Sequence, residues 1–397
     1  MSAAARLGIV LLIALALGAS YWASQFGIDL AVYHSITRLA LFNGGPLYGE
    51  ASGLEYPMWY RYPPLFLFVF APFAALPFKA AVVVWTLMKA ALLAVLVRAL
   101  VGRLGPTACL RRRLEWPLFA AIVGVFVLTE FRYANAQFFI FALTAAALLL
   151  AEKRPNLAAG ALGMGIALKV WPLFFVPYLV ALRRWRLAAA SLVVAGVLTM
   201  APIVYFGWGQ HLHNLQQWRA QESHIAANGG SIWFPSQSLF GVLTRHLTEV
   251  NYAAMPDPNY PSINWASFDP AHVRLGWIAL AAAGYASLLA LAWRTQPKSL
   301  LYLHGVAFCA LVFLQPFSQK QTALVVLIWP ALLAAASVVK LPLSVKWMPF
   351  AAAFITLIQP ITQSGYWNRV YQVWGVDALT MLLLAATLVV SIQREKG

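Results

Sequence analysis

The sequence predicts an all-α polytopic membrane protein, because it is poor in charge, carries many apolar runs and gathers its basic residues in alternate loops. Hydrophobic residues make up 62% of the 397 residues, charged residues only 10%, and the mean hydropathy is +0.73. A soluble domain carries roughly 25% charged residues, because water must solvate its surface. Lipid is therefore the main solvent of this chain, and a soluble protein is excluded.

Apolar runs suited to crossing about 30 Å of hydrocarbon recur along the chain. Two further apolar stretches, 64–78 and 157–182, are interrupted by proline or lysine, and we expect them to dip into the membrane or to be broken. This gives about 10–13 membrane segments, with outer-face loops that carry short interfacial helices. Full crossings are expected near residues 7–25, 80–97, 116–129, 137–151, 187–206, 273–293, 299–315, 322–339, 347–361 and 371–392.

The N-terminal apolar run also has the pattern of a secretory signal, with Arg6 before residues 7–20. Its apolar core continues to Trp22 and no clear small-residue cleavage site follows. We therefore expect an uncleaved first helix.

The net charge of +16 indicates topology. With the N-terminus inside, 17 of the 28 basic residues fall in loops of one side, and positively charged loops are retained in the cytoplasm. We thus expect a multi-pass protein of the cytoplasmic (inner) membrane with both termini cytoplasmic, and no nucleic-acid partner, because no nucleic-acid motif accompanies the charge. The 17 are Arg6, Arg98, Arg103, Arg111, Arg112, Arg113, Lys153, Arg154, Arg183, Arg184, Arg186, Arg294, Lys298, Lys340, Lys346, Arg394 and Lys396.

The other ionisable residues concentrate on the opposite side. Eight of the twelve acidic residues and six of the seven histidines fall there, so any chemistry is expected to face the periplasm or cell exterior. Cys109 lies in an arginine-rich loop and Cys309 in an apolar run, so neither a disulfide nor a cysteine metal site is expected.

The first outer loop, 26–64, places Asp29 just after the first span and before a stretch, Leu30–Leu41, with apolar residues at helical spacing. That stretch predicts a short helix on the membrane surface. One interpretation makes Asp29 the N-cap of this helix. The other makes it a partly desolvated carboxylate at the lipid–water boundary, acting as a general base.

The loop ends in Tyr60-Arg61-Tyr62-Pro63-Pro64-Leu65, where the prolines predict an extended entry into the membrane. Arg61 stands between two tyrosines. It is either an interfacial anchor with a snorkelling side chain or an anion site, since a guanidinium suits phosphate.

Several motifs, in their order along roughly residues 25 to 340, resemble glycosyltransferase family 87. This family comprises polytopic GT-C-type enzymes that take sugar from a polyprenyl-phosphate donor. The motifs are Asp29, Leu47-Tyr48, the Tyr60–Leu65 run, Gln137 at a helix start (with Ala136 in place of glycine), Lys169-Val170-Trp171-Pro172, and Gln237-Ser238-Leu239-Phe240-Gly241-Val242-Leu243-Thr244-Arg245 (with Ser236 in place of asparagine).

The sequence departs from the family pattern at 316–321. Lys320 and Gln321 stand where many relatives carry histidines.

The resemblance implies a role for each matched position. Asp29 becomes the general base that takes the proton of the acceptor hydroxyl, in a direct displacement with inversion. The donor phosphate is expected to contact Arg61, Lys169 and Lys320, whose charge stabilises the leaving group. Substrate-binding positions are expected at Tyr62, Gln137, Gln237, Ser238, Arg245 and Gln321.

Lys169 is informative on physical grounds alone. It lies between basic residues at 153–154 and 183–186, and about 27 residues cannot cross the membrane twice as helix. A broken or re-entrant pair places Lys169 at membrane depth in a protein-lined cavity, where ionisable groups are functional. The alternative is a snorkelling lysine on one continuous span.

The long outer segment, 209–271, is the expected place for acceptor recognition, and Trp233 and Trp265 are candidates to stack on sugars. His211 and His213 lack carboxylates at ligand spacing, so we interpret them as a solvated pair at a helix edge. We expect no metal and no cofactor, because a polyprenyl monophosphate lacks the pyrophosphate that Mg²⁺ commonly bridges.

The sequence thus predicts one GT-C-like transmembrane domain over residues 1–397. Its predicted function is an inverting glycosyltransferase that moves a sugar, by the resemblance mannose, from a polyprenyl-phosphate donor to a lipid or glycan acceptor among membrane lipids. Two alternatives stay open: a secondary transporter or lipid-linked-sugar flippase, and a structural membrane subunit. Transporters place ionisable groups near the midplane and show internal repeats, whereas here those groups lie in outer loops and no convincing repeat is found.

Overall fold

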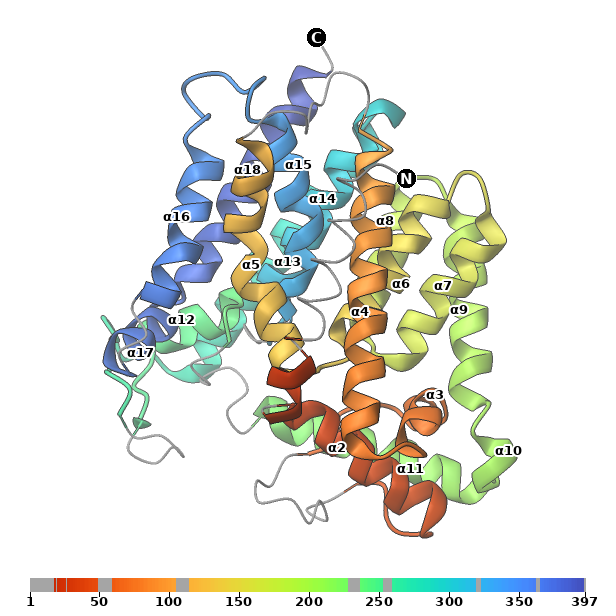
Figure 1. Ribbon diagram of the computed structural model, residues 1–397. Helices are drawn as coiled ribbons and strands as arrows, with labels where there is room; N and C mark the ends of the chain where they lie inside the picture. The colour runs from red at the N-terminus through yellow and green to blue at the C-terminus, as the bar shows by residue number, and fades with distance from the viewer. Residues whose placement is uncertain are drawn as a thin grey trace. The chain divides into compact units, whose positions relative to one another are not determined.

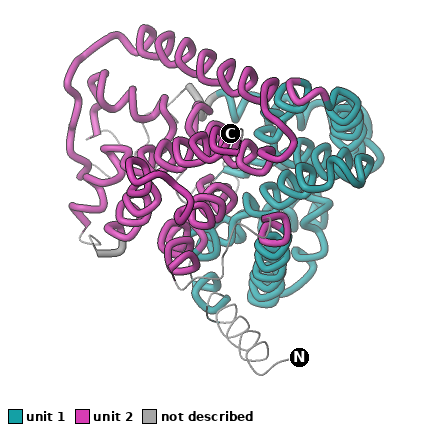
Figure 2. The backbone as a smooth tube through the Cα atoms, turned by 90° about the horizontal axis from the view of Figure 1, so that it is seen from above, with its two compact units in different colours: residues 1–99, 128–180, 184–224 teal, residues 100–127, 181–183, 225–397 magenta. Residues whose placement is uncertain are grey.

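The regular structure of the chain is helical. The computed structural model describes residues 18, 20–25, 27–48, 59–104, 114–227, 236–252, 259–318, 323–361 and 365–395, and no β-strand occurs in them (Figure 1). This confirms the predicted all-α class. The chain forms two compact units: unit 1 comprises residues 1–99, 128–180 and 184–224, and unit 2 comprises residues 100–127, 181–183 and 225–397 (Figure 2).

Unit 1 carries the first outer loop and the segments around Lys169. Its helices are α2 (Ile28–Thr37), a π-helical turn (Arg38–Phe42), α3 (Leu65–Ala74), most of α4 (Phe78–Val101), α6 (Gln137–Leu150), α7 (Pro155–Leu168), a 3₁₀ turn (Trp171–Phe174), α8 (Phe175–Ala181), α9 (Trp185–Met200), α10 (Ile203–Phe206) and most of α11 (Trp208–Ala227).

Unit 2 contains the C-terminal helices. They are α12 (Leu239–Leu247), α13 (Pro270–Arg294), a 3₁₀ turn (Pro297–Ser299), α14 (Leu300–Leu314), a second 3₁₀ turn (Ala323–Leu327), α15 (Ile328–Ser337), α16 (Met348–Ile361), α17 (Gly365–Trp374) and α18 (Val376–Arg394). The helix α5 (Glu115–Tyr133) belongs to unit 2 up to residue 127 and to unit 1 from residue 128.

Six helices in the described part of the chain are long and apolar enough to cross a membrane. They are Phe78–Val101, Glu115–Tyr133, Trp185–Phe206, Pro270–Arg294, Pro297–Leu314 and Val376–Arg394. The crossings predicted near 137–151, 322–339 and 347–361 appear as shorter apolar helices of 10–17 residues, and most of 7–25 lies outside the described residues. The run predicted at 371–392 is divided, because Gly375 takes a left-handed conformation (φ 71°) between α17 and α18.

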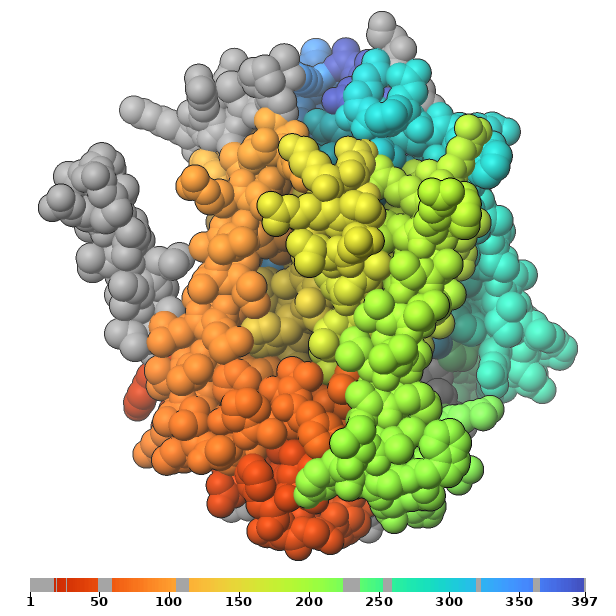
Figure 3. All heavy atoms as spheres, turned by 90° about the vertical axis from the view of Figure 1, so that its right-hand side faces the viewer, coloured from red at the N-terminus to blue at the C-terminus, as the bar shows by residue number. Residues whose placement is uncertain are grey.

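The long helices of unit 1 expose apolar side chains along their length, as a lipid-facing surface requires. Figure 3 shows a face on which α4, in orange, and α9, in green, lie open to the surroundings. The exposed side chains on these two helices include Val84, Leu87, Met88, Val95, Leu192, Val193 and Val197.

The segment 155–181 is a broken pair, as one of the two predictions held. The helix α7 starts with Pro155, which suits a first helical position, and its 14 residues reach about 21 Å, short of a full crossing. It ends at Lys169, whose backbone is extended (φ −159°, ψ 132°), and Pro172 prevents the helix from continuing. The alternative of one continuous span through Lys169 is therefore wrong.

The predicted outer loop 209–271 contains regular structure. Its first part is the 20-residue helix α11, and α12 follows in unit 2. The interpretation of His211 and His213 as a solvated pair is wrong for His211, whose side chain is fully buried, whereas His213 is exposed. A buried histidine on a helix of polar character gives no distinct sequence signal.

Helices α7 and α9 pack closely through small residues. A Cβ added to Gly163 would lie 2.6 Å from Val194 Cβ and 2.8 Å from the Ser191 carbonyl oxygen. Small residues at such contacts let two helix backbones approach in a membrane. The neighbouring Gly160 has nothing within 4 Å of the same position.

We expect Gly163→Ala to lower the stability of the protein by about 1–3 kcal/mol, because the added methyl group overpacks the α7–α9 contact. The matched control, Gly160→Ala, places the same methyl group in open space and is expected to leave stability unchanged or slightly raised. Thermal unfolding of both variants in the same detergent measures the difference. Equal unfolding temperatures would contradict the close contact.

Candidate functional site

The residues predicted around the first outer loop come together in unit 1. Asp29 is the second residue of α2, and the N-cap of that helix is Gly27, which has no side chain to cap it. The Asp29 carboxylate instead accepts a hydrogen bond at Oδ2 from Asn135 Nδ2, at 2.8 Å. The N-cap interpretation of Asp29 is therefore wrong, and its carboxylate points at a residue 106 positions away.

Asn135 joins three parts of the site. Its Oδ1 accepts hydrogen bonds from the Tyr62 hydroxyl at 3.2 Å and from the backbone N–H of Gln137 at 2.9 Å. These two donors require an oxygen at that position, so the amide nitrogen must face Asp29. Asn135 was not among the predicted site residues. An asparagine in a short turn between two apolar helices, two residues before Gln137, is the signal that could have found it.

The turn that presents Asn135 is strained. Ala134, between α5 and α6, has a φ of 53°, a left-handed conformation that is uncommon for a residue with a Cβ. Its carbonyl oxygen accepts a hydrogen bond from Trp85 Nε1 at 3.0 Å, and Ala134 is buried. Such backbone conformations persist where the surroundings over-determine them, and they cluster at functional sites.

The segment Tyr60–Pro63 forms no helix, as the prolines predicted, and Pro64 already has the helical backbone angles of the N-cap of α3 (φ −55°, ψ −29°). Side chains from other segments satisfy the backbone of this segment. The carbonyl oxygen of Tyr60 accepts from Gln221 Nε2 at 2.7 Å, that of Arg61 from Lys169 Nζ at 3.4 Å, and that of Tyr62 from the Tyr48 hydroxyl at 2.9 Å. Three consecutive carbonyl groups thus accept hydrogen bonds from side chains, where a helix or sheet would supply backbone N–H groups. These bonds fix the backbone of residues 60–62.

Tyr62 is buried in an aromatic cluster rather than exposed as an interfacial anchor. The hydroxyl of Tyr33 donates to that of Tyr62 at 3.3 Å, and the rings of Tyr62 and Phe66 lie 4.2 Å apart. Tyr33 follows Asp29 by four positions on α2, so both side chains share one face of the helix. A hydrogen-bonded chain therefore runs from Tyr33 through Tyr62 and Asn135 to the Asp29 carboxylate.

Arg61 forms a two-pronged ion pair with Glu222 of α11. Its Nε and NH2 donate to the two carboxylate oxygens at 2.9 and 2.8 Å. The two side chains are 27% and 29% exposed, so the pair lies at the edge of the protein interior. Glu222 is not among the predicted site residues, and no motif marks it in the sequence.

Lys169 lies beside the same segment. Its ammonium group sits 4.2 Å from the centre of the Tyr62 ring, in a cation–π contact, besides its bond to the Arg61 carbonyl. The break between α7 and α8 allows this, because the extended backbone at Lys169 projects the side chain away from the helix axis. Gln137, which starts α6, accepts a hydrogen bond from Trp171 Nε1 at 2.8 Å and thereby connects that helix start to the Lys169 motif.

A buried ion pair lies next to these residues. Lys89 Nζ on α4 lies 3.0 Å from Glu130 Oε1 on α5, and both side chains are essentially unexposed. Glu130 Oε1 also accepts from the backbone N–H of Phe138 at 3.1 Å. Removing one member of such a pair leaves an uncompensated charge, so the pair ties α4, α5 and the start of α6 together.

The electrostatic setting of Asp29 suits a base. Burial raises the pKa of the Asp29 carboxyl above its ordinary value, and the Asn135 hydrogen bond and the charges of Lys89, Lys169 and Arg61 oppose this rise. A carboxylate with a raised pKa is a stronger proton acceptor, and perturbed groups of this kind cluster at active sites.

Three of the predicted substrate-binding residues lie in unit 2, where their side chains contact the backbone of that unit. Ser238 caps α12 by accepting from the Gly241 N–H, Gln237 Nε2 donates to the Gln372 carbonyl, and Arg245 Nε donates to the Val373 carbonyl. All three are buried, and these contacts hold α12 against α17. Lys320 and Gln321 lie outside the described residues, as does Trp233.

Comparison with known proteins gives a family match, a similar sequence and a distantly similar solved structure. A family model described as glycosyltransferase family 87 matches residues 59–316. The polyprenol-phosphate-mannose-dependent α-(1-2)-phosphatidylinositol mannoside mannosyltransferase of Mycobacterium tuberculosis (strain ATCC 25618 / H37Rv) is 28% identical over 256 residues. That match covers 59% of this chain and 58% of the relative, so it spans little more than half of either protein.

A solved structure, ArnT from Cupriavidus metallidurans bound to undecaprenyl phosphate, is similar over 96% of this chain and 77% of that one. The TM-score is 0.37 and the sequence identity 14%, which is too distant to support conclusions about the site.

We expect Glu222→Gln to lower the free energy of unfolding by about 1 kcal/mol at pH 7, because the negative charge that pairs with Arg61 is lost. Burial raises the pKa of Glu222, but the Arg61 hydrogen bond and the charges of Lys169 and Arg61 bring it below its ordinary value of 4.5. The stabilisation is therefore fully present above pH 4.5 and is lost as the pH falls through the lower folded-state value.

Thermal unfolding of wild type and variant at neutral and acidic pH checks this expectation. The two proteins should differ at pH 7 and converge under acid. The control is Glu152→Gln, which removes the carboxylate of a pair with Arg184 in which Glu152 is 58% exposed; it should change little at either pH. A loss of stability in Glu222→Gln that persists under acid would show that the ion pair is not its cause.

Proposed function

The chain belongs to glycosyltransferase family 87, and we propose that it transfers a sugar from a polyprenyl-phosphate donor to a lipid or glycan acceptor, with Asp29 as the general base. The observation that carries this proposal is the position of the Asp29 carboxylate. It is half-buried, fixed by Asn135, and influenced by the charges of Arg61 and Lys169. A transfer of this kind needs one base and a cationic place for the leaving phosphate.

The chemical step follows from these groups. The acceptor hydroxyl oxygen attacks the anomeric carbon of the donor sugar as its proton passes to the Asp29 carboxylate. The bond from the anomeric carbon to the phosphate oxygen breaks, and its electron pair leaves with the polyprenyl phosphate. No proton is needed on this leaving group. Arg61 and Lys169 stabilise the charge that develops on it, and Lys320 is proposed as a third contact.

Inversion at the anomeric carbon is the simplest stereochemical outcome. One carboxylate acts as base, and the proposal contains no nucleophile that would form a covalent sugar intermediate. A single displacement inverts the configuration, as it does in inverting hydrolases where water replaces the acceptor.

Mannose is the proposed sugar, supported by the M. tuberculosis relative, which is a polyprenol-phosphate-mannose-dependent mannosyltransferase. No metal or cofactor is proposed. The loops that carry Asp29 and Arg61 are proposed to face the periplasm or cell exterior, and the basic loops the cytoplasm. The remaining motif residues, Gln237, Ser238, Arg245 and Gln321, stay proposals for substrate contact.

The function is tested by incubating the purified chain with polyprenyl-phosphate mannose and polyprenyl-phosphate arabinose in separate reactions containing a membrane-lipid acceptor extract. We expect polyprenyl phosphate to be released from the mannose donor alone. Asp29→Asn should lower this release by at least about a thousandfold, because the isosteric amide cannot accept the proton. Chromatography of the lipid products gives the measurement.

The control for this test is Asp269→Asn, which changes another outer carboxylate. Asp269 caps α13 by accepting from the Ala271 N–H, and asparagine caps a helix equally well, so full activity is expected. Turnover by Asp29→Asn at the wild-type rate would disprove the base assignment. Sugar transfer from neither donor would disprove the function.

We expect Asn135→Asp to shift the acidic limb of the pH–rate profile to higher pH by about one unit or more. The substitution keeps an oxygen for Tyr62 and Gln137 but replaces the donor to Asp29 with a second carboxyl group. Two adjacent carboxylates resist ionising together, so the pKa of the base rises and a higher pH is needed to deprotonate it. The control, Asn264→Asp in a loop of unit 2, should leave the profile in place. A uniformly slower enzyme with an unmoved profile would contradict the contact with the base.

We expect Lys169→Gln to raise the KM for the donor and to lower kcat/KM by about 100-fold, because a charge beside the leaving phosphate is lost. The acidic limb of the profile depends on Asp29 and should remain. Lys79→Gln removes an exposed charge from the start of α4 and serves as the control. Steady-state kinetics with the preferred donor measure both. An unchanged KM and kcat in Lys169→Gln would remove Lys169 from the phosphate site.

A further inference from the structure

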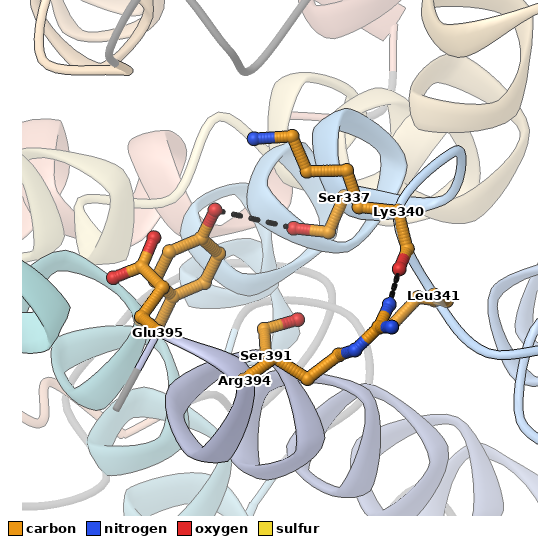
Figure 4. Close-up of a pocket in the computed structure, with 7 residues that line it drawn as sticks. Ser337, Lys340, Leu341, Ser391, Arg394 and Glu395 are labelled. Atoms are coloured by element: carbon orange, nitrogen blue, oxygen red, sulfur yellow. Dashed lines mark hydrogen bonds between the residues drawn. The ribbon is translucent and has the colours of Figure 1, made fainter. Parts of the chain in front are cut away.

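A cavity of about 430 Å³ lies in unit 2. It is formed by residues of α14, α15 and α18 and of the turns that follow the last two (Figure 4). Its polar lining consists of three hydroxyl groups and three charged groups, those of Tyr302, Ser337, Ser391, Lys340, Arg394 and Glu395. The proposed transfer reaction uses none of them.

The floor and the rim of this cavity differ in character. Tyr302, Ser337 and Ser391 are buried, and the first two hydroxyls are 3.4 Å apart. Lys340 and Arg394 are exposed at the rim. The site is therefore a polar recess with a cationic opening.

The recess lies near the ends of candidate membrane spans. Pro297–Leu314 and Val376–Arg394 are both long and apolar enough to cross a membrane. Tyr302 lies five residues inside the first span and Ser391 three residues inside the second, which places them about 8 Å and 5 Å from the helix ends. Both positions thus lie near the end of a span, where the hydrocarbon of a bilayer gives way to its headgroups. The basic residues predict that this end faces the cytoplasm.

The hydrogen-bonding capacity of the floor is specific. The hydroxyls of Ser337 and Ser391 donate to the carbonyl oxygens of Leu333 and Thr387, at 2.7 and 2.9 Å. The Ser391 oxygen can therefore only accept a further hydrogen bond, whereas that of Ser337 is also in hydrogen-bond contact with the Tyr302 hydroxyl. The Glu395 carboxylate can likewise only accept hydrogen bonds, and one of its oxygens accepts from the Ser299 hydroxyl at 3.2 Å. This side of the recess suits a ligand that carries hydrogen-bond donors.

The opposite side suits an anion. Lys340 forms no ion pair within the described residues, and Arg394 donates one N–H to the Lys340 carbonyl oxygen, which leaves other N–H groups of its guanidinium. Two cations and one carboxylate give the rim a net positive charge. Basic pockets between membrane helices favour anionic headgroups in this way.

We propose that this recess binds an anionic phospholipid with a hydroxylated headgroup, of the phosphatidylglycerol type. The phosphodiester lies against Lys340 and Arg394. The headgroup hydroxyls donate to Ser391 and Glu395. A zwitterionic ethanolamine lipid also offers donors, but it brings no net negative charge to the cationic rim.

Native mass spectrometry of the full chain in detergent tests this proposal, with phosphatidylglycerol, phosphatidylethanolamine, phosphatidic acid and inorganic phosphate as separate probes. Wild type should retain phosphatidylglycerol in preference to phosphatidylethanolamine. The double variant Lys340→Gln/Arg394→Gln should weaken phosphatidylglycerol binding about tenfold, since the two basic side chains contact its phosphate. The control, Lys346→Gln, removes one charge from the same turn region outside the cavity and should bind as wild type.

Ser391→Ala separates a recess from a general attraction of anions. This variant should weaken the binding of phosphatidylglycerol and leave the binding of phosphatidic acid unchanged, because the phosphatidic acid headgroup has no hydroxyl on an alcohol carbon to donate to Ser391. Unfolding temperatures without added lipid establish that each variant is folded. If the double variant does not fold, Ser391→Ala still tests the proposal.

Three outcomes would overturn the proposal. They are equal phosphatidylglycerol binding by wild type and Ser391→Ala, equal retention of phosphatidylglycerol and phosphatidylethanolamine by wild type, and displacement of phosphatidylglycerol by inorganic phosphate at equal concentration. The last would assign the recess to a free anion.

Discussion

The amide of Asn135 is the interaction on which the candidate site depends. It donates to the Asp29 carboxylate and accepts from both the Tyr62 hydroxyl and the Gln137 backbone, so one side chain fixes the orientation of α2, the segment 60–63 and the start of α6. An amide can do this because it carries a donor and an acceptor in one rigid plane, whereas an ionised carboxylate would leave the contact with Asp29 unmade. The left-handed turn at Ala134 is the local conformation that presents it. Strain in the backbone and a fully used amide therefore occur in adjacent residues.

A second constraint is the absence of regular structure in Tyr60–Pro64. Two prolines remove N–H donors and prevent helix, yet this segment has to lie among buried tyrosines. Its carbonyl groups are satisfied by Gln221, Lys169 and Tyr48, which come from three different segments. Side chains of other segments thus hold residues 60–62 in place. Lys169 therefore has a structural contact as well as its proposed contact with phosphate. The backbone contact is made where α7 ends, at the extended backbone of Lys169.

The sequence was sufficient for features that follow from local chemistry. The low charge predicted the all-helical membrane class, the prolines at 63 and 64 predicted the absence of helix before α3, and the short distance between basic clusters predicted the break at Lys169. Residues whose importance depends on a distant partner were missed. Nothing in the local sequence distinguishes Asn135 or Glu222, because their partners Asp29 and Arg61 are distant along the chain. The Lys89–Glu130 pair joins two apolar helices, and no spacing rule indicates it. The N-cap alternative for Asp29 failed for the same reason, since the competing partner lay 106 residues away.

The pairing of Arg61 with Glu222 has a consequence for the order of events at the proposed site. Glu222 belongs to α11, and with Gln221 it attaches that helix to residues 60 and 61. If the donor phosphate takes the guanidinium in the proposed reaction, the Glu222 carboxylate loses this partner, while the Gln221 amide still donates to the Tyr60 carbonyl. The state of α11 then reports whether a donor is present. The chain from 209 onward, expected to recognise the acceptor, begins in this helix, so a compulsory order of substrate binding would follow from the exchange of a single ionic partner.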